Sequence, residues 1–151
     1  MNLTMYTDYS LRVLIYLGSR KGKIVTITEI AQYYRVSRNH LVKVVHGLGK
    51  NGFIETIRGK GGGMQLKGDP RQITIGEVVR KTEPNFHIVE CFDENNKRCI
   101  LHSACGLKSV LAEANRAFLE VLDRYTLDRF LQDPEAMKDL WSQVGHGQWQ
   151  V

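Results

Sequence analysis

Long apolar runs are missing from this 151-residue sequence, and proline and cysteine are scarce, with three residues of each. The longest continuous apolar stretch, residues 13–17, is far too short to span a bilayer. The N-terminus lacks the basic segment that precedes the apolar core of a secretory signal. These absences predict a cytoplasmic protein that has no membrane partner and, in a reducing compartment, few disulfides.

Arrangements of catalytic residues are also missing. No Ser/His/Asp set, carboxylate pair or histidine-rich metal-ligand pattern can be argued from the spacing of the residues. The glycine-rich stretch at 59–63 lacks the G-x-x-x-x-G-K-[ST] spacing and the surrounding βαβ unit of a nucleotide-binding loop. We therefore predict that the protein is not an enzyme.

Charge, by contrast, is plentiful and unevenly distributed. Residues 1–70 carry 11 Lys and Arg against four Asp and Glu, whereas residues 71–151 carry 10 against 12. The net charge of +5 therefore arises entirely in the N-terminal half. A basic surplus of this kind indicates a polyanionic partner for that half.

Three helices are predicted in the first fifty residues. The first follows Asp8, whose ordinary role would be to cap its N-terminus, and runs for about ten residues. The second opens at a capping box, in which Thr26 is followed three positions later by Glu29. The third is capped by Ser37 and ends at one of the glycines at 49 and 52. Its inner face is made of Leu41, Val44, Val45 and Leu48.

The second and third helices are separated by a short break and therefore form a helix-turn-helix. In this motif the first turns of the later helix enter the major groove, where Arg and Asn read guanine and adenine edges. An ordinary solvated helix surface is the alternative interpretation of the same residues. The predicted DNA contacts from the two helices are Thr28, Ser37, Arg38, Asn39, His40 and Lys43.

A β-hairpin is predicted directly after the helix-turn-helix. Residues 53–58 alternate as in a strand, residues 59–63 form a glycine-rich turn, and residues 64–66 return as a second strand. The arrangement is that of a winged helix, in which the glycines would let the backbone approach phosphate. The predicted DNA contacts near the tip are Arg58, Lys60 and Gly61.

All three cysteines lie within 15 positions, on a polar segment expected to be an exposed loop. Seven residues separate Cys91 from Cys99 and five separate Cys99 from Cys105, so their thiolates can converge on one metal centre. An iron–sulfur cluster prefers four such ligands, which leaves one position to be filled from elsewhere. The alternatives are zinc, for which closer cysteine pairs are usual, a disulfide with one free thiol, and cysteines that bind no metal.

The longest helical pattern follows the cysteines. Before them, a capping box at Thr74 and Glu77 predicts a short helix that ends at residues 83–84. After them, apolar residues recur at alternating spacings of four and three, as in a coiled-coil seam. A core within one chain would also explain the pattern, but little chain remains to cover it, which favours a homodimer. The predicted seam is Leu107, Leu111, Ala114, Phe118, Val121 and Tyr125.

These features together resemble the family of winged-helix repressors that carry an iron–sulfur cluster. The resemblance covers nearly the whole chain, from residue 3 to about residue 131, and is strongest with the nitric-oxide-sensing members. Other members place a histidine two or three residues after the third cysteine, where this chain has Leu107 and Lys108, with His102 earlier instead. The matching stretches are YTDYSLR at 6–12, VSRNH at 36–40, IRGKGGG at 57–63, IGEVVR at 75–80 and CGLK at 105–108.

The resemblance implies a cytoplasmic homodimeric repressor that holds one 4Fe-4S cluster in each subunit, with a 2Fe-2S form possible after oxidation. It implies that Cys91, Cys99 and Cys105 are cluster ligands and that Asp8 of the partner subunit is the fourth. Nitric oxide would be the signal that abolishes binding to an operator in double-stranded DNA. A sensor of iron–sulfur status or redox state is the first alternative, and a cluster-carrying electron-transfer protein is the second.

The predicted fold is mainly α with a small β-hairpin. It comprises a winged helix-turn-helix DNA-binding domain (residues 1–83) and a cluster-binding loop (84–106). A long dimerisation helix and a C-terminal helix follow (107–144), the latter running from Asp133 to Trp141, and the chain ends in a flexible tail (145–151).

Overall fold

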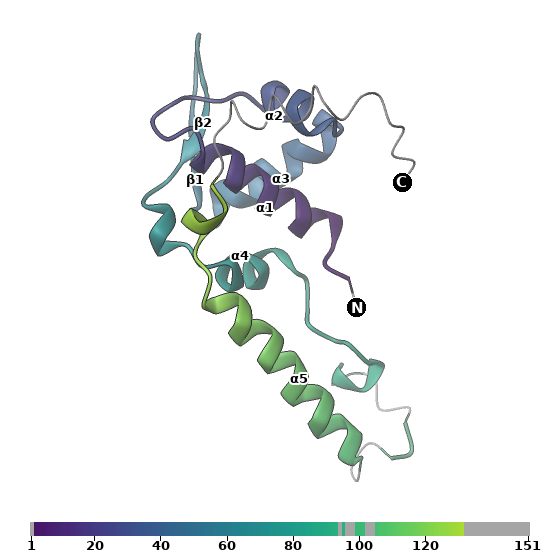
Figure 1. Cartoon of the computed structure of the whole chain (residues 1–151). Coiled ribbons are helices and arrows are strands. Elements are labelled where there is room, and N and C mark those ends of the chain that lie inside the picture. Colours follow the sequence, from purple (N-terminus) through teal and green to yellow (C-terminus); the bar gives the residue numbers. More distant parts are fainter. Residues whose placement is uncertain (1, 94, 96–98, 102–104, 132–151) are drawn as a thin grey trace, which may run out of the picture.

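A group of four helices and a β-hairpin forms one end of the molecule, and a long fifth helix projects away from it (Figure 1). The computed structural model describes residues 2–93, 95, 99–101 and 105–131, so the helix predicted from Asp133 and the tail lie outside the described residues. The predicted mainly α fold with a small hairpin is confirmed. No helix in the described part of the chain has the length and apolar character needed to cross a membrane. The elements are α1 (Met5–Gly18), α2 (Ile27–Tyr34), α3 (Arg38–Lys50), β1 (Ile54–Ile57), β2 (Gly63–Leu66), η1 (Pro70–Gln72), α4 (Ile75–Thr82), η2 (Glu90–Phe92), α5 (Gly106–Asp123) and η3 (Leu127–Phe130).

The N-terminus of α1 is capped by Thr4, and the prediction that Asp8 caps it is wrong. The Thr4 hydroxyl accepts a hydrogen bond from the Thr7 backbone N–H at 3.2 Å. Thr4 is itself held by Glu83, whose Oε1 accepts from the Thr4 backbone N–H at 2.7 Å and from the Thr4 hydroxyl at 3.0 Å. Asp8 therefore lies inside the first turn of α1, where a carboxylate is favoured by the helix dipole.

Helices α2 and α3 form the predicted helix-turn-helix. The Thr26 hydroxyl accepts from the Glu29 backbone N–H at 3.2 Å, which confirms the N-cap at Thr26. The Glu29 carboxylate accepts from the Tyr16 hydroxyl at 3.0 Å. Ser37 occupies the N-cap position of α3, but its hydroxyl makes no capping hydrogen bond, so that part of the prediction is wrong. The predicted inner face of α3 is confirmed, since all four of its residues are buried: Leu41, Val44, Val45 and Leu48.

The hairpin pairs β1 with β2 in antiparallel register, with Ile54 opposite Leu66 and Ile57 opposite Gly63. The chain between α1 and α2 adds one more pairing to the hairpin, at Met64 of β2. In this pairing, beside the Thr56–Met64 pair of the hairpin, Val25 and Met64 exchange both backbone hydrogen bonds, at 2.9 and 2.8 Å. Both side chains are buried, so the hairpin is tied to the domain core. Sequence analysis did not predict this pairing because a single bridged residue has no periodicity.

The C-terminal end of α5 is fastened to the same core. Leu127, in the short helix η3 that sequence analysis did not predict, is fully buried. Its backbone N–H donates to the Ile73 carbonyl at 2.8 Å, and the Ile75 N–H donates to the Tyr125 carbonyl at 2.9 Å. The N-terminal end of α5, next to the cysteines, lies far from these bonds (Figure 1).

Candidate nucleic-acid interface and cysteine segment

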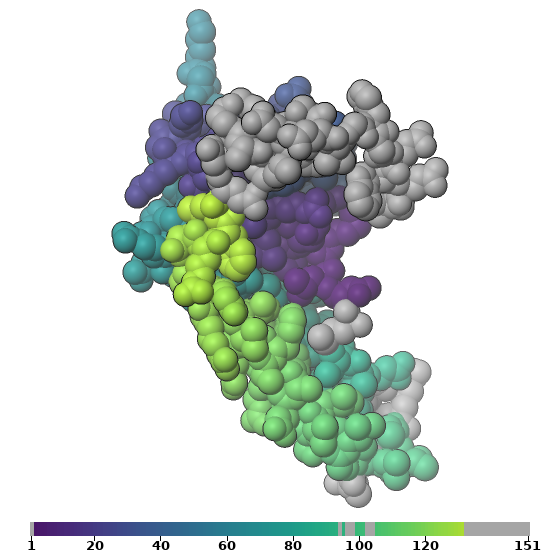
Figure 2. Space-filling model, viewed as in Figure 1, coloured from purple at the N-terminus to yellow at the C-terminus, as the bar shows by residue number. Residues whose placement is uncertain are grey.

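All nine residues predicted to contact DNA are exposed, on the three elements from which a winged helix approaches a duplex. The hairpin that carries three of them stands out from the domain as a narrow projection (Figure 2). The nine are Thr28 in the first turn of α2, Ser37, Arg38, Asn39, His40 and Lys43 at the start of α3, and Arg58, Lys60 and Gly61 in the wing.

His40 differs from its neighbours because it also contacts α1. Its ring stacks on the ring of Tyr9, with centroids 6.2 Å apart and planes inclined by 25°. The Arg12 guanidinium lies 5.8 Å from the centre of the same Tyr9 ring. His40 therefore connects the recognition helix to α1, a contact between distant sequence positions that no local pattern indicates.

The glycines of the wing turn are required by the backbone of the wing itself. Gly59 and Gly61 have φ angles of 100° and 80°, in the left-handed region that glycine tolerates best. A Cβ added at Gly62 or Gly63 would collide with backbone carbonyl oxygens. These local requirements account for the glycines without any close approach to phosphate, so Arg58 and Lys60 carry the argument for DNA contact at the tip.

Arg12 pairs with Asp8, which lies one helical turn earlier in α1. Arg12 Nε donates to Asp8 Oδ1 at 3.1 Å, and Arg12 Nη2 lies 2.8 Å from Asp8 Oδ2, so both carboxylate oxygens are engaged. The Tyr34 hydroxyl donates to the Arg12 backbone carbonyl at 3.0 Å and joins α1 to α2. The Asp8 side chain is 45% exposed, and an ion pair this exposed adds little to stability. The carboxylate can therefore exchange partners at small cost.

The three cysteines are free thiols. Cys91 lies in η2 and is half-buried, Cys99 is exposed, and Cys105 is half-buried immediately before α5. Among the described residues, no group of three or more His, Cys, Asp and Glu side chains is gathered closely enough to hold a metal ion, and His102 lies outside them. The donor chemistry fits an iron–sulfur cluster, because cysteine thiolates are the usual ligands of such clusters.

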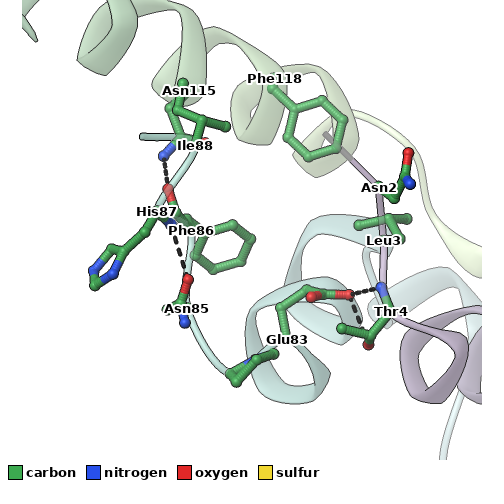
Figure 3. A pocket seen from close by; sticks show the side chains of 11 residues that line it. Asn2, Leu3, Thr4, Glu83, Asn85, Phe86, His87, Ile88, Asn115 and Phe118 are labelled. Carbon is green, nitrogen blue, oxygen red and sulfur yellow. Dashed lines mark hydrogen bonds between the residues drawn. The ribbon is translucent and has the colours of Figure 1, made fainter. Parts of the chain in front are cut away.

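A cavity of about 400 Å³ lies between the N-terminal segment, the chain that follows α4, and α5 (Figure 3). Leu3, Phe86 and Phe118 supply apolar walls. Asn115 Nδ2 donates to the Phe86 carbonyl at 2.8 Å and so attaches α5 to the chain after α4. Phe118, a member of the predicted seam, therefore lines a space within one chain.

Helix α5 contains no buried residue. One face packs against the domain core through Leu119 and Leu122. Of the predicted seam, Leu111 and Phe118 are half-buried, while the other four residues are exposed. Two residues outside the predicted seam, Val110 and Ala117, are exposed beside those four. We call this set the exposed stripe: Leu107, Val110, Ala114, Ala117, Val121 and Tyr125.

An exposed recognition helix, a projecting wing and a basic surplus over the same half of the chain define a winged-helix DNA-binding regulator. A family model described as an iron-dependent transcriptional regulator matches residues 3–133. The chain belongs to this family, Rrf2.

Known relatives agree with this assignment. The HTH-type transcriptional regulator NsrR of Bacillus subtilis strain 168 is 55% identical over 141 residues, which are 93% of this chain and 97% of that protein. Among solved structures, CymR, the global cysteine regulator of B. subtilis, has a TM-score of 0.69 at 26% identity and covers 85% of this chain and 94% of its own. IscR of T. potens has a TM-score of 0.67 at 25% identity, with 97% and 94% covered. The resemblance predicted from the sequence motifs is confirmed.

Proposed function

We propose that the protein is a cytoplasmic homodimeric repressor that releases its operator when nitric oxide reacts with a 4Fe-4S cluster held by the cysteine segment. The observation that carries the proposal is the combination, in one chain, of an exposed recognition helix with three free thiols within 15 positions. The 55% identity to a protein named NsrR supports the choice of nitric oxide as the signal.

DNA binding would use both exposed elements of each subunit. The first turns of α3 would enter the major groove, where Arg38 and Asn39 can donate hydrogen bonds to base edges. The wing would lie along the adjacent minor groove, where Lys60 can neutralise phosphate. Two subunits related by a two-fold axis would then read two half-sites of matching symmetry.

Dimerisation would use the exposed stripe on α5. Leu107 is 63% exposed and Val110 is 59% exposed, although both are large apolar side chains. An apolar stripe along a helix, left uncovered by the residues that the structure describes, is a typical surface for a second copy.

The cluster ligands would be Cys91, Cys99 and Cys105, with Asp8 of the partner subunit as the fourth. When bound, such a cluster supplies iron that reacts with nitric oxide. An aspartate oxygen is a harder donor than a thiolate and so a weaker match for this iron, which makes the Asp8 position the natural point of attack. Arg12, which engages both oxygens of Asp8, would orient the carboxylate for this role.

The switch would pass from Asp8 to DNA through α1. Asp8 bound across the dimer would fix the position of α1, and α1 contacts the recognition helix through the Tyr9–His40 stack. Once Asp8 is released, the exposed pair with Arg12 is the contact that holds its side chain among the described residues. A shift from a population that mostly binds the operator to one that mostly does not takes about 5.5 kcal/mol of differential stabilisation between the two states. Two bridging carboxylates per dimer are a plausible source of that energy.

Anaerobic purification tests the cluster. We expect iron and sulfide contents and Mössbauer spectra of a 4Fe-4S cluster, with the absorption lost on addition of nitric oxide. Cys99→Ser should give a nearly colourless protein that remains dimeric, because the exposed stripe needs no metal. Full iron and sulfide content in that variant would remove Cys99 from the ligand set.

Operator binding tests the switch. A duplex selected from a random-sequence pool with the cluster-loaded protein should bind that form tightly and bind the apo and nitrosylated forms poorly. Asp8→Ala should keep a cluster but reduce the difference between loaded and apo protein, whereas the control Glu113→Ala should not. Equal affinity of apo and loaded wild-type protein would rule out the cluster as the switch.

The likeness to IscR supports one alternative function for this protein, that of a sensor of cluster status or redox state. Such a protein would release the selected duplex when the cluster is lost by oxidation, and nitric oxide would have no larger effect than oxidant alone. The same binding assay, run with each reagent separately, distinguishes the two.

A further inference from the structure

Helix α1 meets the recognition helix α3 through two tyrosines that stand on either side of Asp8 in the sequence. Tyr9 stacks on His40, in the first turn of α3. Tyr6, about one turn earlier in α1, lies against Gly47, near the other end of α3. The two contacts are separated by about 10 Å along one face of α3. Together they fix the direction of α3 relative to α1, which a single contact would leave free to tilt.

The contact at Gly47 leaves no room for a side chain. A Cβ added there would enter the space that the Tyr6 hydroxyl oxygen fills, and it would lie 3.0 Å from Cζ of the same ring. Gly47 lies within α3 and does not have a positive φ, so the backbone does not require glycine there. Glycine inside a helix is also less favourable than alanine. The glycine is therefore explained by the Tyr6 hydroxyl, which needs the opening that it leaves in α3.

Gly49 provides a comparison within the same helix. A Cβ added at Gly49 would meet Ile54 Cγ1 at 4.0 Å, which is an ordinary van der Waals distance. Space for a methyl group thus exists at Gly49, whereas at Gly47 that space is taken by Tyr6. The Tyr6 side chain is partly buried and packs against the domain core, which holds its ring over Gly47.

We propose that Tyr6 is a positioning residue, whose hydroxyl sets the placement of the recognition helix on α1 by filling the space over Gly47. This inference rests on the proposed function and adds a fixed point to its switch. With Asp8 bound across the dimer, α1 is held, and the Tyr6 contact keeps α3 in the direction that presents Arg38 and Asn39 to the bases. With α1 released, the hydroxyl can leave this space, and α3 can tilt. Packed helices respond to small displacements of this kind by changing between discrete arrangements.

The test combines substitutions on both sides of this contact, with Gly49→Ala as the matched control. Gly47→Ala forces the hydroxyl out, Tyr6→Phe removes it, and the double variant places a methyl group in the space that the hydroxyl has left. Each full-length protein is prepared anaerobically with its cluster, and its iron and sulfide contents are measured. Its affinity for the selected operator is then measured by fluorescence anisotropy in the loaded and apo forms. The readout is the ratio of these two affinities.

Gly47→Ala should reduce this ratio about tenfold at unchanged iron content, because α3 no longer follows α1. Tyr6→Phe should reduce it about threefold, since an empty space loosens the contact without forcing the helices apart. The double variant should return to within about twofold of the wild-type ratio, because the methyl group replaces the hydroxyl. Gly49→Ala should keep the wild-type ratio. Binding to random DNA should be the same in all variants, because none of them changes a charge.

A wild-type ratio in Gly47→Ala would overturn the inference. Failure of the double variant to recover would also overturn it, because the loss would then come from the added methyl group and not from its collision with the Tyr6 hydroxyl. If Gly47→Ala does not fold, Tyr6→Phe decides, and an unchanged ratio in that variant rejects the inference. Equal operator affinity of loaded and apo wild-type protein would mean that the proposed switch itself fails, which is distinct from a failure at Tyr6 alone.

Discussion

The winged-helix domain and the projecting helix α5 accommodate their apolar side chains in different ways. Helices α1, α3 and α4 each bury several residues, whereas α5, with 18 residues, buries none. The domain therefore carries its own core, while α5 presents the exposed stripe, which the described part of the chain leaves uncovered. Similar apolar spacing along two helices thus builds the core in one region and leaves apolar side chains exposed in the other.

The same substitution made in both regions should separate these two uses. Leu48 is fully buried and Leu107 is 63% exposed. Leu48→Ala should cost about 2–5 kcal/mol in the free energy of unfolding at any protein concentration. Leu107→Ala should cost less than about 0.5 kcal/mol in dilute protein, where the monomer dominates. Its effect should increase with concentration as the dimer forms. Urea unfolding at a low and a high protein concentration measures the loss of unfolding free energy in each variant. Equal losses for the two variants in dilute protein would contradict the comparison.

A charge placed on the exposed stripe should break the dimer without unfolding the domain. Val121→Asp puts a carboxylate toward the C-terminal end of the exposed stripe, where a second copy would have to bury it. We expect monomers in sedimentation velocity and an unchanged melting temperature in dilute protein. Ser109→Asp introduces the same side chain at an exposed position outside the stripe and should remain dimeric. A dimeric Val121→Asp protein would place the interface elsewhere.

Substitutions at the DNA-facing end of the domain should change binding and leave assembly alone. Arg38→Ala should cost about 1–3 kcal/mol on the selected operator and relax its base preference. Lys60→Ala should weaken binding to all duplexes alike and reduce the salt slope. Competition between operator and random DNA distinguishes the two results. Equal losses on both kinds of DNA for Arg38→Ala would refute its role in reading bases.

The smallest effect is expected where the two regions meet. Arg80 Nη2 donates to Asp123 Oδ2 at 2.6 Å and links α4 to the end of α5. Hydrogen bonding to Arg80 holds the pKa of the Asp123 carboxyl below its usual value. A carboxyl whose pKa is lower in the folded state adds stability above its unfolded pKa, and that stability is lost as the pH falls through the folded pKa.

Asp123→Asn should therefore lower the melting temperature slightly at neutral pH and leave it unchanged in strong acid. The effect is small because both side chains are exposed and the pair is screened by solvent. Thermal unfolding at the two pH values gives the comparison. A decrease in melting temperature of the same size at both pH values would show that the ion pair is not its cause.

Elements whose causes are local could be predicted from the sequence. The N-cap at Thr26 and the buried face of α3 depend on residues within a few positions of one another, and both are confirmed. The start of α1 could not be predicted in the same way, because Thr4 and Asp8 are both good capping residues. The choice depends on Glu83, which is distant in the sequence and bonds to Thr4.

Two further features could not be predicted from nearby residues, namely the rotation of α5 about its own axis and the left-handed turn at Arg35. The apolar spacing predicted the helix and most of the exposed stripe, but the contact of Phe118 with the cavity is fixed by chain segments that no local pattern includes. The left-handed turn carries no glycine to signal it. The ligand set stays a prediction, because part of the cysteine segment lies outside the described residues.

The attachment of α5 has a mechanical consequence. The backbone bonds that join Leu127 to Ile73 and Ile75 to Tyr125 hold its C-terminal end, and its 18 residues extend from there as a rod about 27 Å long. For a rod of that length, a tilt of about 10° at the held end displaces the other end by about 5 Å, close to the rise of one helical turn. Cys105 lies at that distant end. The helix is therefore a lever arm, in which a small rotation at the domain would produce a large displacement at Cys105.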